Sequence, residues 1–164
     1  MDEYLQLLGE RKEKVLKFHA DHYALIKYVP GSGHNHQHWS GGYHDHLIQC
    51  FQIATQLYGM YRRNVSFSLD SVIIVLYFHD VEKLWREKEI DKEEYYTKIL
   101  PEQYEITFTT EELNALKYIH GEGNDYQKGK RVMNELAALC HACDVLSARC
   151  FHNIRVLQLD EGSI

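Results

Sequence analysis

The feature that most constrains this chain is the apolar run Ser71-Val-Ile-Ile-Val-Leu-Tyr-Phe78, which ends in the adjacent pair His79 and Asp80. A run of this kind belongs in a protein core, so the imidazole and the carboxylate that follow it are expected to be carried inward. Burying both groups without a partner is costly. Neutral imidazole and ionised carboxylate both offer lone pairs near neutral pH, and a divalent cation offsets their desolvation. We therefore interpret the pair as metal ligands at the end of a buried helix.

Two further segments place a ligand-type residue inside a helical apolar pattern. His46 opens one of them, and its side chain is expected on or beside the buried face. Asp144 lies within the other, where an unpaired carboxylate is rarely found. Both side chains can therefore point to the same ion as His79 and Asp80. The apolar residues of the two segments are Leu47, Ile48, Phe51, Ala54, Leu57, Tyr58 and Tyr61, and Leu136, Leu139, Cys140, Ala142, Cys143 and Leu146.

The order of these residues, with His46 first, His79-Asp80 next and Asp144 last, resembles the HD-domain superfamily of metal-dependent phosphohydrolases. The resemblance covers roughly residues 36 to 150, and its motifs are closest to the HD domains of bacterial 3'-to-5' exoribonucleases. A lone His-Asp pair is weak evidence, whereas the ordered set is specific. The matching motifs are Gly41-Gly42 before His46, His79-Asp80-Val81-Glu82-Lys83 (HD-x-x-K), His120-Gly121-Glu122, Leu139-Cys140-His141 (Leu-x-His) and Asp144-Val145-Leu146-Ser147-Ala148 (Asp-x-Leu-x-Ala).

This resemblance implies an all-α fold, an HD-domain helical bundle with a central metal site. Residues 1–164 would form one such domain, which their number also allows. Residues 1–30 are expected to be a helical segment packed on the bundle, and residues 31–43 a loop rich in His and Gly. The implied cofactor is a divalent metal ion, for which Mn, Fe, Mg, Co, Ni and Zn all suit a mixed nitrogen and oxygen shell. Binding of two ions is left open.

The resemblance also assigns roles around the ion. Lys83 lies four residues after His79 and would stabilise the charge that develops on a phosphate. Glu82 and Glu122 are the nearest carboxylates that could act as general acid or base, and neither has a decisive claim. The predicted metal ligands are His46, His79, Asp80 and Asp144, the catalytic residues Lys83, Asp80 and Glu82, and the substrate-binding residues His36, His120, Glu122 and Arg149.

Two histidines keep two interpretations each. His120 either contacts the substrate phosphate or a second ion, or it caps the end of its helix beside Gly121. His141 lies three residues before Asp144 and on the same helical face. It is either a ligand of a dinuclear site or a core histidine bonded to a backbone carbonyl.

The predicted activity is hydrolysis of a phosphoester or phosphoanhydride bond, with a small phosphorylated substrate, a nucleotide, as first choice. A net charge of -6 counts against binding of long nucleic acid, while a metal and a few local cations suffice to hold one phosphate. A 3'-end nuclease or cyclic-nucleotide phosphodiesterase is the main alternative among enzymes. A non-catalytic, metal-stabilised nucleotide-binding protein is the alternative outside them. Pairing of two copies into a homo-oligomer is left open.

The composition is that of a soluble protein without a membrane partner, with 45% hydrophobic and 26% charged residues and two prolines. No apolar run is long enough to span a membrane and no secretory segment begins the chain, so we expect a cytoplasmic location. Each of the four cysteines falls in an apolar helical pattern, which is typical of reduced core residues. Cys140-x-x-Cys143 could instead bind zinc or do redox chemistry, but no second Cys pair accompanies it.

Helix boundaries are predicted from caps and breakers. Residues 2–28 form one long or two shorter helices that end before Pro30. Ser68 or Asp70 caps the helix that leads to His79, and Thr109 begins a capping box. Residues 87–98 are predicted as a peripheral helix, 104–108 as a short extended piece and 121–131 as a flexible loop.

Overall fold

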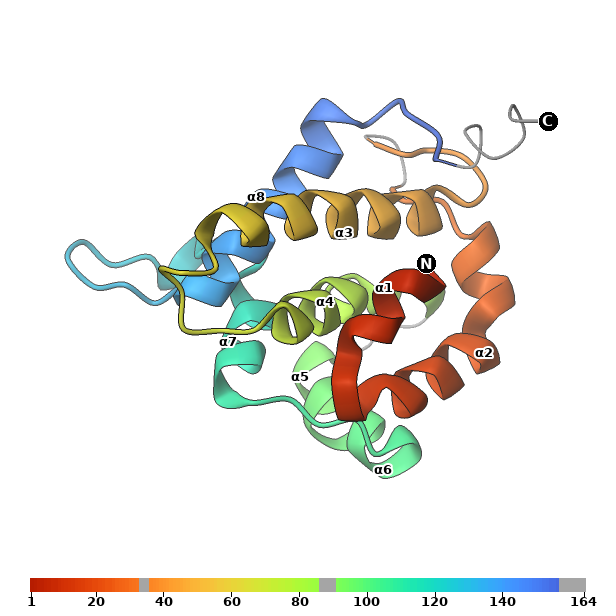
Figure 1. Cartoon of the computed structure of the whole chain (residues 1–164), viewed down its shortest axis with the longest axis horizontal. Coiled ribbons are helices and arrows are strands. Elements are labelled where there is room, and N and C mark those ends of the chain that lie inside the picture. Colours follow the sequence, from red (N-terminus) through yellow and green to blue (C-terminus); the bar gives the residue numbers. More distant parts are fainter. Residues whose placement is uncertain (33–35, 86–90, 157–164) are drawn as a thin grey trace.

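The structure is a computed structural model that describes residues 1–32, 36–85 and 91–156 (Figure 1). Its described residues form helices and loops without any strand, which confirms the all-α prediction. None of the described helices combines the length and the apolar character needed to cross a bilayer. The α-helices are α1 (Asp2–Leu5), α2 (Lys12–Tyr28), α3 (Gly42–Tyr61), α4 (Leu69–Phe78), α5 (Lys92–Glu94), α6 (Leu100–Tyr104), α7 (Thr110–Tyr118) and α8 (Glu135–Cys150). Three 3-10 helices, η1 (Gln6–Arg11), η2 (Val81–Trp85) and η4 (Gly123–Asp125), and one π-helix, η3 (Tyr95–Ile99), lie between them.

The apolar run forms α4, the central helix, in which every residue from Val72 to Phe78 is buried. A helix that is apolar on all sides is stable in water only when neighbours cover all of those sides. The helices α3, α8 and α7 and the turn η1 pack against α4 (Figure 1). Because α4 ends at Phe78, His79 and Asp80 follow it while the chain is still in the interior, and both are buried.

The N-terminal segment packs on this bundle as two pieces. Gly9 has φ 55 at the break, a left-handed conformation that glycine adopts at little steric cost. The second piece, α2, ends at Tyr28, ahead of Pro30, as predicted. The segment contributes Leu5, Leu8, Val15, Phe18 and Ile26 to the core.

Both predicted caps are present. The Ser68 hydroxyl accepts a hydrogen bond from the Ser71 amide at 3.2 Å, so Ser68 and not Asp70 caps α4. Thr109 and Glu112 form the predicted capping box at the start of α7. Side chains close to these helices in sequence therefore determine where two of them begin.

Several boundaries differ from the predictions. The extended piece predicted at residues 104–108 is wrong, because Tyr104 ends α6 and residues 105–109 have no regular structure. The predicted helix 87–98 lies in part outside the described residues, and from Lys92 onward the chain stays helical through η3 to Tyr104. The loop predicted at 31–43 ends at Gly41, because α3 already begins at Gly42. The loop at 121–131 contains η4 and an isolated bridge between Gln127 and Lys130.

The cysteines mostly behave as core residues. Cys50, Cys140 and Cys143 are buried, and burial raises the pKa of each thiol. Cys150, at the last position of α8, is exposed, so the core prediction is wrong for this residue. The apolar periodicity of α8 does not predict burial at Cys150, because none of the other described helices covers this residue at the end of α8.

A buried carboxylate ties the N-terminal segment to α7. Glu112 is fully buried, and its Oε2 accepts hydrogen bonds from Arg11 Nη1 at 2.8 Å and from the Thr109 amide at 2.9 Å. The other guanidinium nitrogen of Arg11 pairs with Asp70 at the start of α4. Three elements thus meet at one ionic cluster, and loss of the buried member would leave Arg11 without its innermost partner.

We expect Glu112→Ala to lower the free energy of unfolding by about 3 kcal/mol, because it removes the buried ion pair with Arg11 and the Glu112 half of the capping box. Its exposed neighbour provides the matched control, and Glu111→Ala should change stability by less than about 0.5 kcal/mol. Urea unfolding of the three proteins measures both values. Equal stabilities for the two variants would contradict the assignment.

Candidate metal centre

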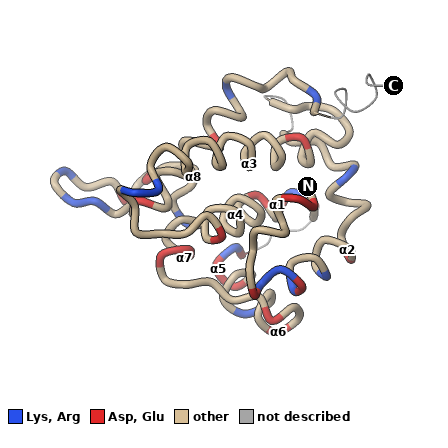
Figure 2. Tube along the Cα trace, in the orientation of Figure 1, with Lys and Arg blue, Asp and Glu red and all other residues tan. Residues whose placement is uncertain are grey.

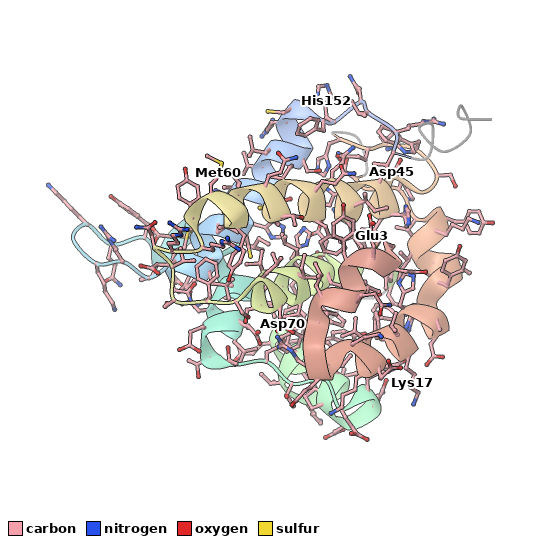
Figure 3. The ribbon with its side chains drawn as sticks, in the orientation of Figure 1. Glu3, Lys17, Asp45, Met60, Asp70 and His152 are labelled. Atoms are coloured by element: carbon pink, nitrogen blue, oxygen red, sulfur yellow. The ribbon has the colours of Figure 1, made fainter. Side chains whose placement is uncertain are left out.

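Four helices deliver polar side chains to one place in the core. His46 comes from the second turn of α3, and His79 and Asp80 follow the last turn of α4. Asp144 lies in the middle of α8, and His120 follows the end of α7. Figure 3 shows how densely side chains fill the interior between α3 and α4. The helix axes therefore set the positions of these groups, which lie far apart in the sequence.

The candidate ligand atoms lie at spacings that are compatible with one metal ion. His46 Nε2 and His79 Nε2 are 3.3 Å apart. Asp144 Oδ1 is 3.3 Å from His46 Nε2 and 3.7 Å from His79 Nε2. Asp80 Oδ2 is 3.3 Å from His79 Nε2 and 3.9 Å from His46 Nε2. Two donors that each sit about 2.1 Å from a common ion are roughly 3 to 4 Å apart at the usual ligand angles. His46, His79 and Asp80 thus form one group that could hold a metal ion, and Asp144 lies within 4 Å of both imidazoles.

Both imidazoles turn the same nitrogen toward the cluster. His79 Nδ1 lies 2.7 Å from the Leu76 carbonyl, and His46 Nδ1 lies 2.9 Å from the Ser147 hydroxyl. These contacts occupy the Nδ1 atoms, so the Nε2 atoms are left to face each other. Outer hydrogen bonds of this kind orient the histidine ligands of metal sites.

Burial and charge compete in setting the protonation of the cluster. Burial disfavours the charged form of His46 and lowers its pKa to about 4. Burial acts on His79 in the same direction, but Asp80 and Asp144 outweigh it and raise the His79 pKa to about 10. Burial raises the pKa of each carboxyl group, and the neighbouring imidazoles outweigh this and hold both values well below the usual range. In the metal-free protein, His79 therefore holds a proton that faces the neutral His46.

His120 joins the cluster from the solvent side. Its Nε2 is 3.2 Å from Asp80 Oδ1 and 3.9 Å from Asp144 Oδ2, and its side chain is 48% exposed. With His79 and Asp144 it forms another group that could hold an ion. His141 differs, because its Nδ1 lies 2.5 Å from the Ile119 carbonyl. This contact agrees with the core interpretation of His141, whereas His120 lies where a ligand or substrate contact is expected.

Lys83 also reaches the cluster, although not by the predicted route. The prediction placed it one helical turn beyond His79, but α4 ends at Phe78 and Lys83 lies in the 3-10 turn η2. Its ammonium pairs with Asp80, three residues earlier, rather than standing above His79. A 3-10 turn brings residues three apart onto one face, which accounts for this pairing. The side chain is 18% exposed, so Lys83 lies at the boundary between the cluster and solvent.

The two candidate acid or base residues have structural partners. Glu82 Oε1 pairs with Lys92 at 2.8 Å, and Lys92 also donates to the His79 carbonyl at 3.1 Å. Glu122 Oε1 accepts from the Met133 amide at 3.2 Å and so closes the loop between α7 and α8. Among the described contacts neither carboxylate reaches the four ligands.

Of the two remaining predicted substrate-binding residues, His36 lies beside the cluster and Arg149 does not. The His36 ring lies 5.5 Å from the His46 ring, centroid to centroid, so the loop before α3 borders the cluster as predicted. Arg149 is exposed on α8, five residues after Asp144. Five residues on a helix correspond to a rotation of about 140°, which turns Arg149 away from the cluster. The structure therefore does not bring Arg149 to the site.

Cys50 was not among the predicted site residues, yet its Sγ lies 3.7 Å from His46 Nε2. It forms a further group with His46 and Asp144 that could hold an ion. The spacing of four residues from His46 was a visible signal for this neighbour. Ser147, the hydroxyl partner of His46 Nδ1, left no comparable signal, because it comes from the distant helix α8.

Comparison with family models, curated proteins and solved structures gave no match. The resemblance to HD-domain proteins therefore depends on the sequence motifs alone.

We expect Mn²⁺ or Zn²⁺ to stabilise the protein, because an ion satisfies four buried ligands in the folded state only. At a free concentration about 100-fold above Kd, the gain should be about 2.7 kcal/mol, which corresponds to a rise in Tm of roughly 5 to 10 °C. Thermal unfolding with and without metal measures it. Asp144→Asn should abolish the rise, whereas the exposed-site control Asp21→Asn should retain it. A rise that survives in Asp144→Asn would show that the ion binds elsewhere.

Metal affinity should increase with pH. Because the pKa of His79 is about 10, this imidazole is protonated at neutral pH, and a metal ion must displace the His79 proton in order to bind. One displaced proton makes the affinity rise about tenfold per pH unit between roughly pH 6 and 8. Calorimetric titrations in buffers of different ionisation enthalpy count the released proton. Binding heats that do not depend on the buffer would contradict this assignment.

Proposed function

We propose that the protein is a divalent-metal-dependent phosphohydrolase of the HD type that acts on a small nucleotide. The observation that carries the proposal is the pair of buried Nε2 atoms of His46 and His79, 3.3 Å apart and flanked by two carboxylates. Buried imidazoles and carboxylates are rare unless they share a partner. A divalent ion is such a partner, and the mixed nitrogen and oxygen donors suit Mn, Fe, Co, Ni, Zn or Mg.

In this proposal His46, His79, Asp80 and Asp144 hold the ion. When bound, it polarises a phosphoryl oxygen and lowers the pKa of water toward neutrality. The protein supplies the dry surroundings, since all four side chains are at most 13% exposed. Low exposure strengthens each electrostatic interaction within the site.

Two side chains that can donate hydrogen bonds lie where the cluster meets solvent. The Lys83 ammonium pairs with Asp80. Once the Asp80 carboxylate is shared with an ion, the ammonium becomes available to a phosphate oxygen. His120 is half exposed beside the same carboxylate, and its imidazole can donate to the phosphate or to the leaving oxygen. Both residues thus lie where charge develops during phosphoryl transfer.

The charge distribution supports a small substrate. The net charge is -6, and in Figure 2 lysines and arginines are scattered over several elements, with acidic residues between them. Long nucleic acids bind through many phosphate contacts along a basic surface. A nucleotide needs only the ion and the one or two cations beside it.

The test is a hydrolysis screen of the Mn²⁺-loaded protein against nucleoside mono-, di- and triphosphates, cyclic nucleotides and short oligonucleotides. We expect release of phosphate or nucleoside from at least one small nucleotide, and no release by Asp80→Ala. Cleavage confined to oligonucleotides or cyclic nucleotides would replace the substrate class by the nuclease or phosphodiesterase alternative. Tight metal binding with no hydrolysis across the panel would favour a non-catalytic nucleotide-binding protein and overturn the proposal.

Lys83→Met should lower kcat by roughly 100-fold with the best substrate, because it removes a cation from the developing charge. The matched control is Lys98→Met, which removes a 60% exposed lysine paired with Glu94. Steady-state kinetics of the two variants, each with its metal content measured, check the assignment. If both variants keep full kcat, Lys83 has no part in the reaction.

A further inference from the structure

We infer that Gln37, Gln49 and Ser147 form a buried hydrogen-bond chain that sets the tautomers of His46 and His36, so that both rings present an unprotonated Nε2. The inference rests on the metal site of the proposed function and adds positioning residues to it. All three members of the chain are at most 4% exposed, so water does not compete for their hydrogen bonds. The donor and the acceptor of each hydrogen bond in this chain can be assigned one after another, starting from Gln49, whose partners can only accept.

That end is Gln49. Its Nε2 lies 2.8 Å from the Ile154 carbonyl and 3.5 Å from the Phe151 carbonyl, just beyond α8. A carbonyl oxygen can only accept, so the amide nitrogen of Gln49 must face these two groups. The Gln49 Oε1 atom is thereby turned inward, where it can only accept.

The next step passes through Ser147. Its hydroxyl lies 2.8 Å from Gln49 Oε1 and must donate there, because that oxygen has no proton to give. The Ser147 oxygen then offers only lone pairs to His46 Nδ1, 2.9 Å away. His46 Nδ1 therefore carries the proton, and the Nε2 of the neutral ring is bare. This is the nitrogen that lies 3.3 Å from His79 Nε2 and within reach of the proposed ion.

Gln37 extends the same logic to His36. The Gln37 Nε2 atom lies 2.7 Å from Gln49 Oε1 and 3.2 Å from the Ser147 carbonyl, both of which only accept. Its Oε1 must therefore face His36 Nδ1, 2.5 Å away, which has to donate. In the neutral form of His36, Nδ1 then carries the proton, and the bare Nε2 belongs to a ring that lies beside that of His46.

The backbone around Gln37 is built to hold this side chain in place. Gln37 has φ 42, a left-handed conformation that costs a non-glycine residue about 1 kcal/mol or more. Gly31 and Gly42 enclose it, and a Cβ at Gly42 would lie 1.8 Å from the Gln37 carbonyl oxygen. Such a loop closes only with glycine at position 42.

The loop is also fastened to the end of α8. The backbone N–H of Gln37 donates to the backbone carbonyl of His152 at 3.0 Å. Figure 3 labels His152 just past the end of α8. The residues after α8 thus anchor both Gln37 and Gln49. Correct placement of the His36 and His46 rings consequently depends on a segment that supplies no ligand of its own.

The experiment compares Ser147→Ala and Ser147→Thr with the control Cys140→Ala. Cys140 is a buried residue of α8 that takes no part in the hydrogen-bond chain. Calorimetry with Zn²⁺ alone measures affinity. We expect Ser147→Ala to weaken Zn²⁺ binding by roughly 10- to 100-fold, as is typical when an outer partner of a histidine ligand is lost. Ser147→Thr, which keeps the hydroxyl, should restore most of it, and Cys140→Ala should leave it unchanged. Unchanged affinity in Ser147→Ala would overturn the inference.

A second measurement needs no variant. Nitrogen-15 spectra of the histidine side chains in the metal-free protein report which ring nitrogen carries the proton. A proton on Nδ1 and a bare Nε2 in His46 is the expected result, and a neutral ring protonated at Nε2 would overturn the inference. If that tautomer is found but the wild-type protein binds neither Zn²⁺ nor Mn²⁺, the inference about the chain stands and the proposed function fails.

Discussion

The approach of two imidazole nitrogens to 3.3 Å inside the core is the interaction on which the rest of this structure depends. Two neutral nitrogens at that distance repel unless a cation or a proton lies between them, and Asp80 and Asp144 attract either one. Without such a partner, four polar side chains would be buried at a cost that a protein of this size can ill sustain. A shared cation or proton would therefore explain why these imidazoles and carboxylates are gathered at one place in the interior.

The fold meets this demand through the character of α4. Because that helix is apolar all round, other helices must surround it, and the residues after its last turn emerge inside the bundle rather than at its surface. Then α3 and α8 need only present one polar residue each from their buried faces. The hydrogen bonds of His46 Nδ1 with Ser147 and of His79 Nδ1 with Leu76 orient the two rings, so groups outside the cluster decide which nitrogens face each other.

Much of this could be predicted from the sequence, and the errors have physical causes. The family resemblance implied the all-α fold, and the apolar patterns predicted that His46, His79, Asp80 and Asp144 point inward, which agrees with side chains that are at most 13% exposed. Lys83 was predicted on a continuing α-helix, whereas a 3-10 turn pairs it with Asp80. Glu122 and Arg149 were predicted to bind substrate, but neither contacts the cluster in the described contacts. Glu122 accepts a hydrogen bond from the Met133 backbone amide, and Arg149 is exposed on another side of α8.

By itself the sequence determined which side chains are polar within apolar patterns, and hence which residues required a common partner. That information is local, since burial follows from the hydrophobicity of near neighbours along a helix. Only the tertiary structure decided the distances between ligand atoms, the entry of His120 and Cys50 into the cluster, and the chain from Ile154 through Gln49 and Ser147 to His46. These depend on how helices cross and where loops close, which no local pattern encodes, because hydrogen bonds between residues about a hundred positions apart form only once the whole bundle has packed.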